Sequence, residues 1–177
     1  MRIRSMMVST AAAAAAATLA SSGYAASGAC SSGTVLKSRS YVFALSISGV
    51  ETMYTPAQVK AKHPKSGEVM LSGTMSGGGM SGMDMSSAGQ RHLEVHICTA
   101  AGAVLTGRHP AIVVSDPKAK TKTMKVPIAT MEGVGEGASD YHYGNNVTLA
   151  TGHKITVTVT LNGQKVVFHA VVRPVSM

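Results

Sequence analysis

The sequence has few aromatic and few acidic residues. Among its 177 residues there are no Trp, five Tyr and two Phe, and eight Asp and Glu stand against 16 Lys and Arg. Proteins that hold single-stranded nucleic acids stack bases on aromatic side chains and cluster their basic residues. Here the lysines are scattered between Lys37 and Lys165. We therefore expect no nucleic-acid partner and interpret the positive charge as solubilising charge.

Long hydrophobic runs are absent after the first 26 residues. Arg2 and Arg4 give a basic start, and an Ala-rich apolar run and small polar residues follow. This pattern predicts a secretory signal peptide at 1–26, too short and too rich in Ala to span a membrane stably. We expect a periplasmic or secreted protein, soluble or surface-attached. A lipid anchor on Cys30 is the less favoured alternative, because Ser27 occupies a position where a lipobox has an aliphatic residue.

Cysteine is also scarce, with only Cys30 and Cys98. Export permits a disulfide between them, which would stabilise the fold by about 4 kcal/mol in the chain-entropy model. We favour this disulfide slightly. The alternative is a thiolate metal ligand at Cys98, since Cys30 lies close to the mature end, in a segment at 27–39 that we expect to be flexible.

Helical periodicity is missing from the mature sequence, apart from a short helix expected around 56–61. Short β-branched runs bounded by turn residues recur instead, and Asn162-Gly163 predicts a type I′ hairpin. The fold class expected is all-β, an immunoglobulin-like antiparallel sandwich that forms one domain at 40–177. The predicted strands are 40–48, 67–74, 91–98, 110–115, 121–128, 146–150, 154–161 and 165–172.

Two segments are predicted to be loops. Residues 75–90 combine Gly and Ser with Met75, Met80, Met83 and Met85. Thioether sulfur is a soft ligand that favours Cu(I), so these methionines are candidates for a second metal site; the alternative is a flexible linker. The second predicted loop, 129–145, is rich in Gly and contains Met131 and His142.

The run RHLEVHIC at 91–98 carries the clearest chemical signal. On a β-strand, alternate side chains share a face, so His92, Glu94 and His96 form one row while apolar residues form the other. Two imidazoles and a carboxylate on a rigid strand are a suitable ligand set for a divalent transition metal. The alternative is a solvated polar face. In the last strand, the same alternation places His169 with two valines and favours a core histidine.

These motifs resemble those of the periplasmic Fe2+ transport proteins. HLEVHI at 92–97 is similar to the family's HLEADIHA, and HYGNN at 142–146 to its HYGAN; FALSISGVETMYTP at 43–56 is similar to its first strand. The resemblance spans most of residues 41–172. It implies an immunoglobulin-like sandwich, usually dimeric, with a metal site near the dimer interface. Such proteins bind iron and copper and work with high-affinity iron permeases.

The resemblance also implies ligands. His92 matches a copper ligand of the family, Glu94 its neighbouring carboxylate, and His142 the histidine of HYGAN. The family's methionine ligand follows a Pro, but Pro127 is followed here by Ile128, so Met131 is the candidate substitute. His96 stands where the family commonly has an acidic residue. These departures favour copper over iron.

The sequence thus predicts a non-enzymatic metal-binding protein with copper or iron at His92, Glu94, His96, Met131 and His142. It would serve metal uptake or delivery with a membrane permease or an efflux component as partner, and the family resemblance makes a homodimer a candidate assembly. Three alternatives stay open: a copper-resistance or chaperone module that uses the Met-rich loop, a superoxide dismutase, and a structural β-sandwich without metal.

Overall fold

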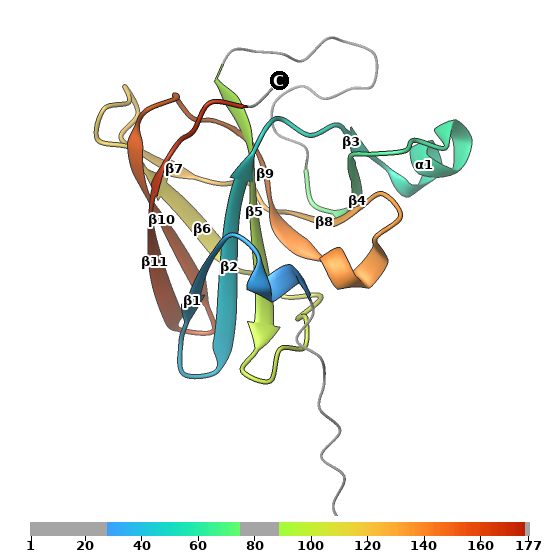
Figure 1. The fold of residues 1–177 in the computed structure, drawn as a ribbon, viewed down its shortest axis with the longest axis horizontal. Coiled ribbons are helices and arrows are strands. Elements are labelled where there is room, and N and C mark those ends of the chain that lie inside the picture. Colours follow the sequence, from blue (N-terminus) through green and yellow to red (C-terminus); the bar gives the residue numbers. More distant parts are fainter. Residues whose placement is uncertain (1–27, 75–88, 176–177) are drawn as a thin grey trace, which may run out of the picture.

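The computed structural model describes residues 28–74 and 89–175. The predicted signal peptide and the methionines Met75, Met80, Met83 and Met85 lie outside the described residues. Within them, two sheets pack face to face (Figure 1). This confirms the predicted all-β sandwich.

The larger sheet has seven strands in the order β1-β2-β5-β9-β8-β4-β3. All neighbours are antiparallel except β3 and β4, which are parallel. Its strands are β1 (Thr34–Lys37), β2 (Tyr41–Ser48), β3 (Met53–Tyr54), β4 (Glu68–Ser72), β5 (Gln90–Thr99), β8 (Ala129–Gly133) and β9 (His142–Thr148).

The smaller sheet has four antiparallel strands in the order β11-β10-β6-β7: β6 (Ala111–Ser115), β7 (Thr123–Lys125), β10 (Lys154–Leu161) and β11 (Gln164–Val171). Strand β10 alternates buried Ile, Val and Leu with half-buried or exposed Lys and Thr. Asn162 and Gly163 both have positive φ, as a type I′ turn requires, and they join β10 to β11.

The core lies between the sheets. From the larger sheet it includes Phe43, Leu93, Val95 and Tyr143, all with no exposed surface, and from the smaller sheet it includes Val157. The alternation of β5 therefore directs one row of side chains into the core. The other row, which holds His92, Glu94 and His96, lies on the outer face of the larger sheet.

The segment 27–39, predicted to be flexible, contains regular secondary structure in its described part. Residues Gly28–Ser31 form the 3-10 helix η1, and β1 pairs with β2. A disulfide between Cys30 and Cys98 fixes η1 to β5. The expected disulfide is thus present, and Cys98 is not a thiolate ligand.

The predicted loop at 129–145 is also wrong. It contains β8, the 3-10 helix η2 (Gly137–Asp140) and the start of β9, which begins at His142 rather than at 146. Strand β8 has no clear alternation, but it pairs on both sides, with β4 and with β9. Tertiary pairing therefore overrides its weak local signal.

The predicted short helix is α1 (Pro56–Lys62). It begins with a capping box, in which the Thr55 side chain accepts from the Gln58 backbone N–H and the Gln58 side chain accepts from the Thr55 backbone N–H. Among the described residues, no helix is long and apolar enough to cross a membrane.

Candidate metal centre

Three histidines meet on the outer face of the larger sheet. His92 and His96 come from β5, and His142 begins the neighbouring strand β9. The ring of His142 lies between the other two, with centroids 5.6 Å from His92 and 5.3 Å from His96. All three side chains are buried, with at most 3 % exposed. A solvated polar face, the alternative from the sequence, does not describe this row.

Each imidazole is held by its Nδ1 atom. His96 Nδ1 donates to the Tyr141 carbonyl at 3.2 Å, and His142 Nδ1 donates to the Asp140 carbonyl at 2.7 Å, because a carbonyl oxygen can only accept. His92 Nδ1 lies 3.1 Å from Asn146 Oδ1.

The Asn146 amide is oriented by the backbone of Glu51. Its Nδ2 donates to the Glu51 carbonyl and its Oδ1 accepts from the Glu51 N–H. The oxygen therefore faces His92, and His92 Nδ1 is the donor. As a result, Nδ1 is the donor in all three rings, and in the neutral form of each ring the Nε2 lone pair is left for a metal ion.

Carboxylates surround these Nε2 atoms. Glu68 Oε2 from β4 lies 3.4 Å from His142 Nε2, and Glu94 lies 3.9 Å from the Nε2 atoms of both His92 and His96. Asp140, at the end of η2, lies 3.9 Å from His96 Nε2 and accepts from the Gly133 N–H. Three separate segments thus bring carboxyl groups to the histidines of β5 and β9.

Glycine allows β9 to pass this close to β5. Gly144 is paired with Glu94, and a Cβ atom at Gly144 would collide with the backbone carbonyl of Leu93. Any larger residue would push the two strands apart and separate His92 from His142. The Gly of the HYGNN segment therefore has a direct steric role in the site.

Burial shifts the protonation of these groups in opposite directions. Burial, together with repulsion from the carboxylates of Asp140, Glu94 and Glu51, raises the pKa of Glu68 to about 8. Burial, together with the nearby His142, lowers the pKa of His92 to about 4. Burial also lowers the pKa of His142. Near neutral pH, His92 and His142 are therefore neutral and able to ligate.

The site contains buried polar atoms without partners. Glu68 Oε2, His92 Nε2 and His142 Nε2 have no hydrogen-bond partner within the described part of the chain. Leaving such atoms buried and unpaired is costly. A cation between them would satisfy all three at once.

The donor geometry suits a metal ion. Ligand atoms from Glu68, His92, Glu94 and His142 all lie within 4.8 Å of one another, and a second such group contains His96, Asp140 and His142. With metal–ligand bonds of about 2.1 Å, two donors on one ion are separated by roughly 3–4.3 Å. The distances above need only small adjustments. These residues could hold a metal ion.

Methionines border the same site. Met131 on β8 is paired with His142, so the two side chains share a face of the sheet. Met131 is fully buried and packs with Met53, Met70 and Ala129. The register therefore brings the predicted Met131 beside His142, within a cluster of thioethers.

The structure thus gathers His92, Glu94, His96, Met131 and His142 on one face. The other described histidines lie elsewhere. His63 caps α1, His109 is exposed just before β6, His153 pairs with Asp116, and His169 is exposed on the outer face of the smaller sheet. The core position expected for His169 is wrong because its row faces outward.

Sequence reasoning missed Glu68, Asp140 and Asn146 as parts of the site.

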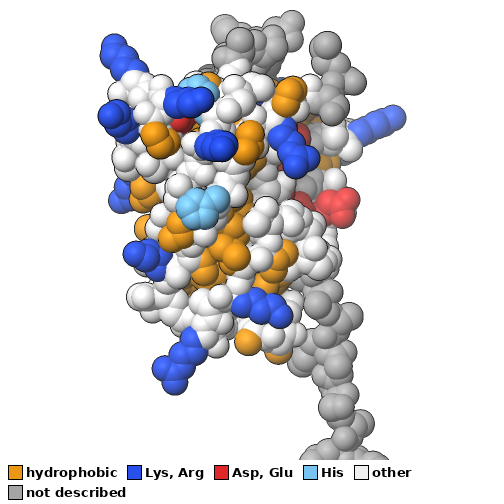
Figure 2. All heavy atoms as spheres, turned by 60° about the vertical axis from the view of Figure 1, so that its left-hand side comes forward, with side chains coloured by type: hydrophobic (Ala, Val, Ile, Leu, Met, Phe, Trp, Pro, Cys, Tyr) orange, Lys and Arg blue, Asp and Glu red, His pale blue; other side chains and the backbone are white. Residues whose placement is uncertain are grey.

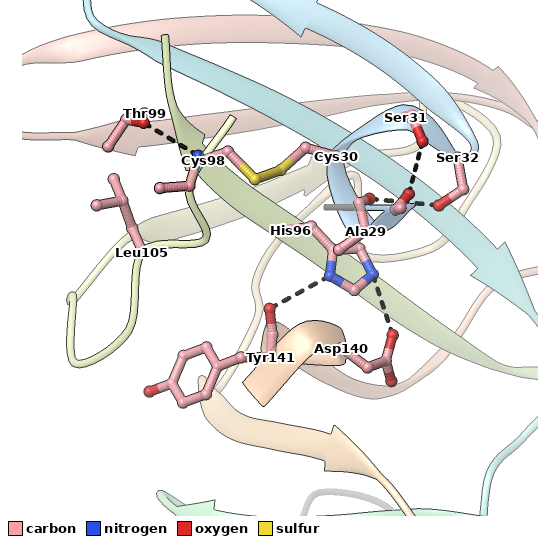
Figure 3. The surroundings of a disulfide bond; sticks show 12 residues. Ala29, Cys30, Ser31, Ser32, His96, Cys98, Thr99, Leu105, Asp140 and Tyr141 are labelled. Carbon is pink, nitrogen blue, oxygen red and sulfur yellow. Dashed lines mark hydrogen bonds and ion pairs between the residues drawn. A yellow bond between two sulfur atoms is a disulfide. The ribbon is translucent and has the colours of Figure 1, made fainter. Parts of the chain in front are cut away.

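The disulfide bounds this site at one end, since Cys98 follows His96 by two residues on the same face (Figure 3). Helix η1 packs against both β5 and η2 there.

No family model, no curated protein and no solved structure matches the chain.

Proposed function

We propose that this protein binds a transition metal, copper or iron, between β4, β5 and β9. One observation carries the proposal: Glu68 Oε2, His92 Nε2 and His142 Nε2 are buried, close together and without hydrogen-bond partners within the described chain. In a purely structural sandwich, apolar residues at these positions would avoid that cost.

The donor set supports this choice of metals. Neutral imidazole suits copper, iron and zinc, carboxylate favours harder ions, and thioether favours Cu(I). Imidazole and carboxylate meet here, with Met131 next to His142. Such mixed ligation fits an ion that changes oxidation state, and of the two metals it favours copper, because the thioether is soft.

The proposed role is metal uptake or delivery outside the cytoplasm. The disulfide supports this compartment, since such bonds persist mainly in oxidising environments. The similarity of HLEVHI and HYGNN to the motifs of the periplasmic Fe2+ transport proteins supports a membrane permease or an efflux component as partner. In this role the metal is cargo, and no catalysis is assigned to the protein.

Metal titration of three variants tests the proposal. We expect His92→Ala and His142→Ala each to lower the affinity for Cu(II) and for Fe(II) by more than 100-fold, exceeding the 10–100-fold typical of residues that only orient ligands. His169→Ala removes an exposed imidazole from the other sheet and should leave both affinities unchanged. Equal binding by all three variants, or no metal binding by the wild type, would overturn the proposal.

A further inference from the structure

The charged residues of the protein are divided unequally between its two sheets. The four-stranded sheet and its adjoining segments, residues 106–126 and 150–175, contain eight Lys and Arg and one acidic residue, a formal net charge of +7. The other described residues contain six basic and six acidic residues. Positive charge is therefore concentrated on the side of the molecule away from the metal centre.

These basic residues are free to meet a partner. All eight are exposed, whereas the one acidic residue, Asp116, is buried and paired with His153 at 2.7 Å. Figure 2 shows Lys and Arg side chains spread over this side of the molecule, with little acidic surface between them. We call the outer surface of β6, β7, β10 and β11 the basic face.

The strands themselves set the pattern of the basic face. Alternate residues of each strand point outward, away from the core. The outward residues include Lys125 on β7, Lys154 on β10 and Lys165 on β11. Between them lie threonines and two exposed valines, Val167 at 38 % and Val171 at 53 % exposed.

We propose that the basic face docks onto an anionic lipid bilayer surface. A surface of dispersed lysines suits diffuse attraction to many lipid headgroups, since lysine acts as a point charge and lacks the fork geometry of arginine. Val167 and Val171 would contact the interfacial region beside the lysines. The strands of the basic face direct no Phe, Tyr or Trp side chain outward, which disfavours base stacking and hence a nucleic acid as the occupant.

This orientation has a consequence for the metal centre. The two sheets lie back to back, so docking by the basic face leaves the outer face of the larger sheet directed away from the lipid. The protein would then be held at the membrane with its His and Glu residues toward the aqueous side. The docking itself does not depend on metal binding.

Vesicle co-sedimentation tests the proposal. The wild-type protein should bind vesicles that contain phosphatidylglycerol and should not bind pure phosphatidylcholine vesicles, and binding should weaken steeply as salt is added. The variant Lys125→Gln/Lys154→Gln/Lys165→Gln should bind about fivefold more weakly per lysine, on the order of 100-fold for three.

A matched variant separates the basic face from net charge. Lys60→Gln/Lys62→Gln/Lys65→Gln makes the same charge change at exposed positions on and after α1, and it should retain binding within about twofold, the residual long-range effect. Lys125→Arg/Lys154→Arg/Lys165→Arg keeps the charge and should also bind. Equal weakening of the two Gln variants would overturn the proposal, as would binding to both kinds of vesicle.

The same variants distinguish lipid from an acidic protein. If poly-glutamate binds through the three strand lysines while phosphatidylglycerol vesicles do not, the membrane proposal is wrong and the basic face serves an acidic polypeptide. Unfolding curves in denaturant should coincide for wild type and variants, because the substituted side chains are exposed.

Discussion

The two sheets carry the same kind of strand alternation but use their polar rows differently. In β10, Thr and Lys alternate with core residues and face outward, half-buried or exposed. In β5, His92 and His96 alternate with core residues in the same way, yet their row is buried. The difference arises from what covers each outer face. Among the described residues, η1 contacts β2 and β5 and η2 contacts β8, whereas the outward side chains of β10 and β11 are exposed or half-buried.

Covering a polar row changes its chemistry. An exposed lysine or threonine is satisfied by water, so the outer face of the smaller sheet needs no further partners. A buried imidazole or carboxylate must find a partner, change its pKa or bind an ion. The metal centre shows the second behaviour: the pKa of Glu68 is raised, the pKa of His92 is lowered, and the Nε2 atoms of His92 and His142 have no hydrogen-bond partner among the described residues.

Removing the disulfide that holds η1 against β5 should have the largest effect on stability. We expect Cys30→Ser/Cys98→Ser to lower the free energy of unfolding by about 4 kcal/mol, because the disulfide joins residues 68 positions apart. Denaturant unfolding measures this change. Ser31→Ala, in the same turn, should cost less than about 1 kcal/mol. Equal stability of the disulfide variant and the wild type would show that η1 covers the site without covalent help.

The next prediction concerns Glu68 and the pH. In the metal-free protein, the pKa of Glu68 is raised from 4.5 to about 8 by burial and neighbouring carboxylates. A raised folded-state pKa gives stability that is fully present below pH 4.5 and is lost as the pH rises to about 8. Glu68→Gln cannot ionise. It should therefore match the wild type near pH 4 and be more stable near pH 9, by about 3 kcal/mol once the roughly 5 kcal/mol that corresponds to this pKa difference is discounted for solvent screening.

Metal should stabilise the wild type more than the Glu68→Gln variant. Unfolding of the wild type and Glu68→Gln at several pH values, with a chelator present, measures the metal-free difference described above. With saturating Cu(II), the wild type should gain more stability than Glu68→Gln, because a carboxylate attracts the cation and an amide does so weakly. A larger gain for the variant would exclude Glu68 from the metal centre.

A smaller effect is expected from the residue that orients His92. Asn146→Ala removes the acceptor for His92 Nδ1, so the ring is no longer held with Nε2 toward the site. We expect metal affinity to fall 10–100-fold, the range for partners that orient ligands. Asn146→Asp keeps an oxygen there and should recover most of the affinity in a Cu(II) titration. If neither variant binds metal more weakly, the imidazole is oriented by packing alone.

The sequence predicted the parts of this comparison that depend on local alternation. The rows of β5 and β10 follow from period-two patterns in 91–98 and 154–161, and the hairpin follows from Asn162-Gly163. Burial of the β5 row could not be predicted, because it depends on distant parts of the chain: η1 and η2 lie at its His96 end, and Asn146 and His142 lie beside His92. The role of Glu68 depends on strand order: β4 precedes β5 in sequence but lies beyond β8 and β9 in the sheet.

Loop-borne ligands were equally inaccessible to sequence reasoning. Asp140 lay in a predicted loop that proved to contain β8 and η2, so its approach to His96 had no local signal. The three site histidines were easier, since His92 and His96 share a strand and His142 follows a Gly-rich segment. A residue type can therefore be assigned to a site from sequence only when a strand row or a recognisable motif carries it.

The last and smallest effect tests whether a histidine–carboxylate pair alone is enough for a metal site. His153 lies 2.7 Å from Asp116 beside the smaller sheet, but its side chain is 24 % exposed and no third ligand from the described residues joins it. Asp116 also accepts from the Lys118 N–H, so it keeps a partner without His153. We expect His153→Ala to lower stability by about 1 kcal/mol or less and to leave Cu(II) affinity within about twofold. A large loss of copper binding would contradict the division of roles between the two sheets, because it would place a ligand on the side that we assign to docking.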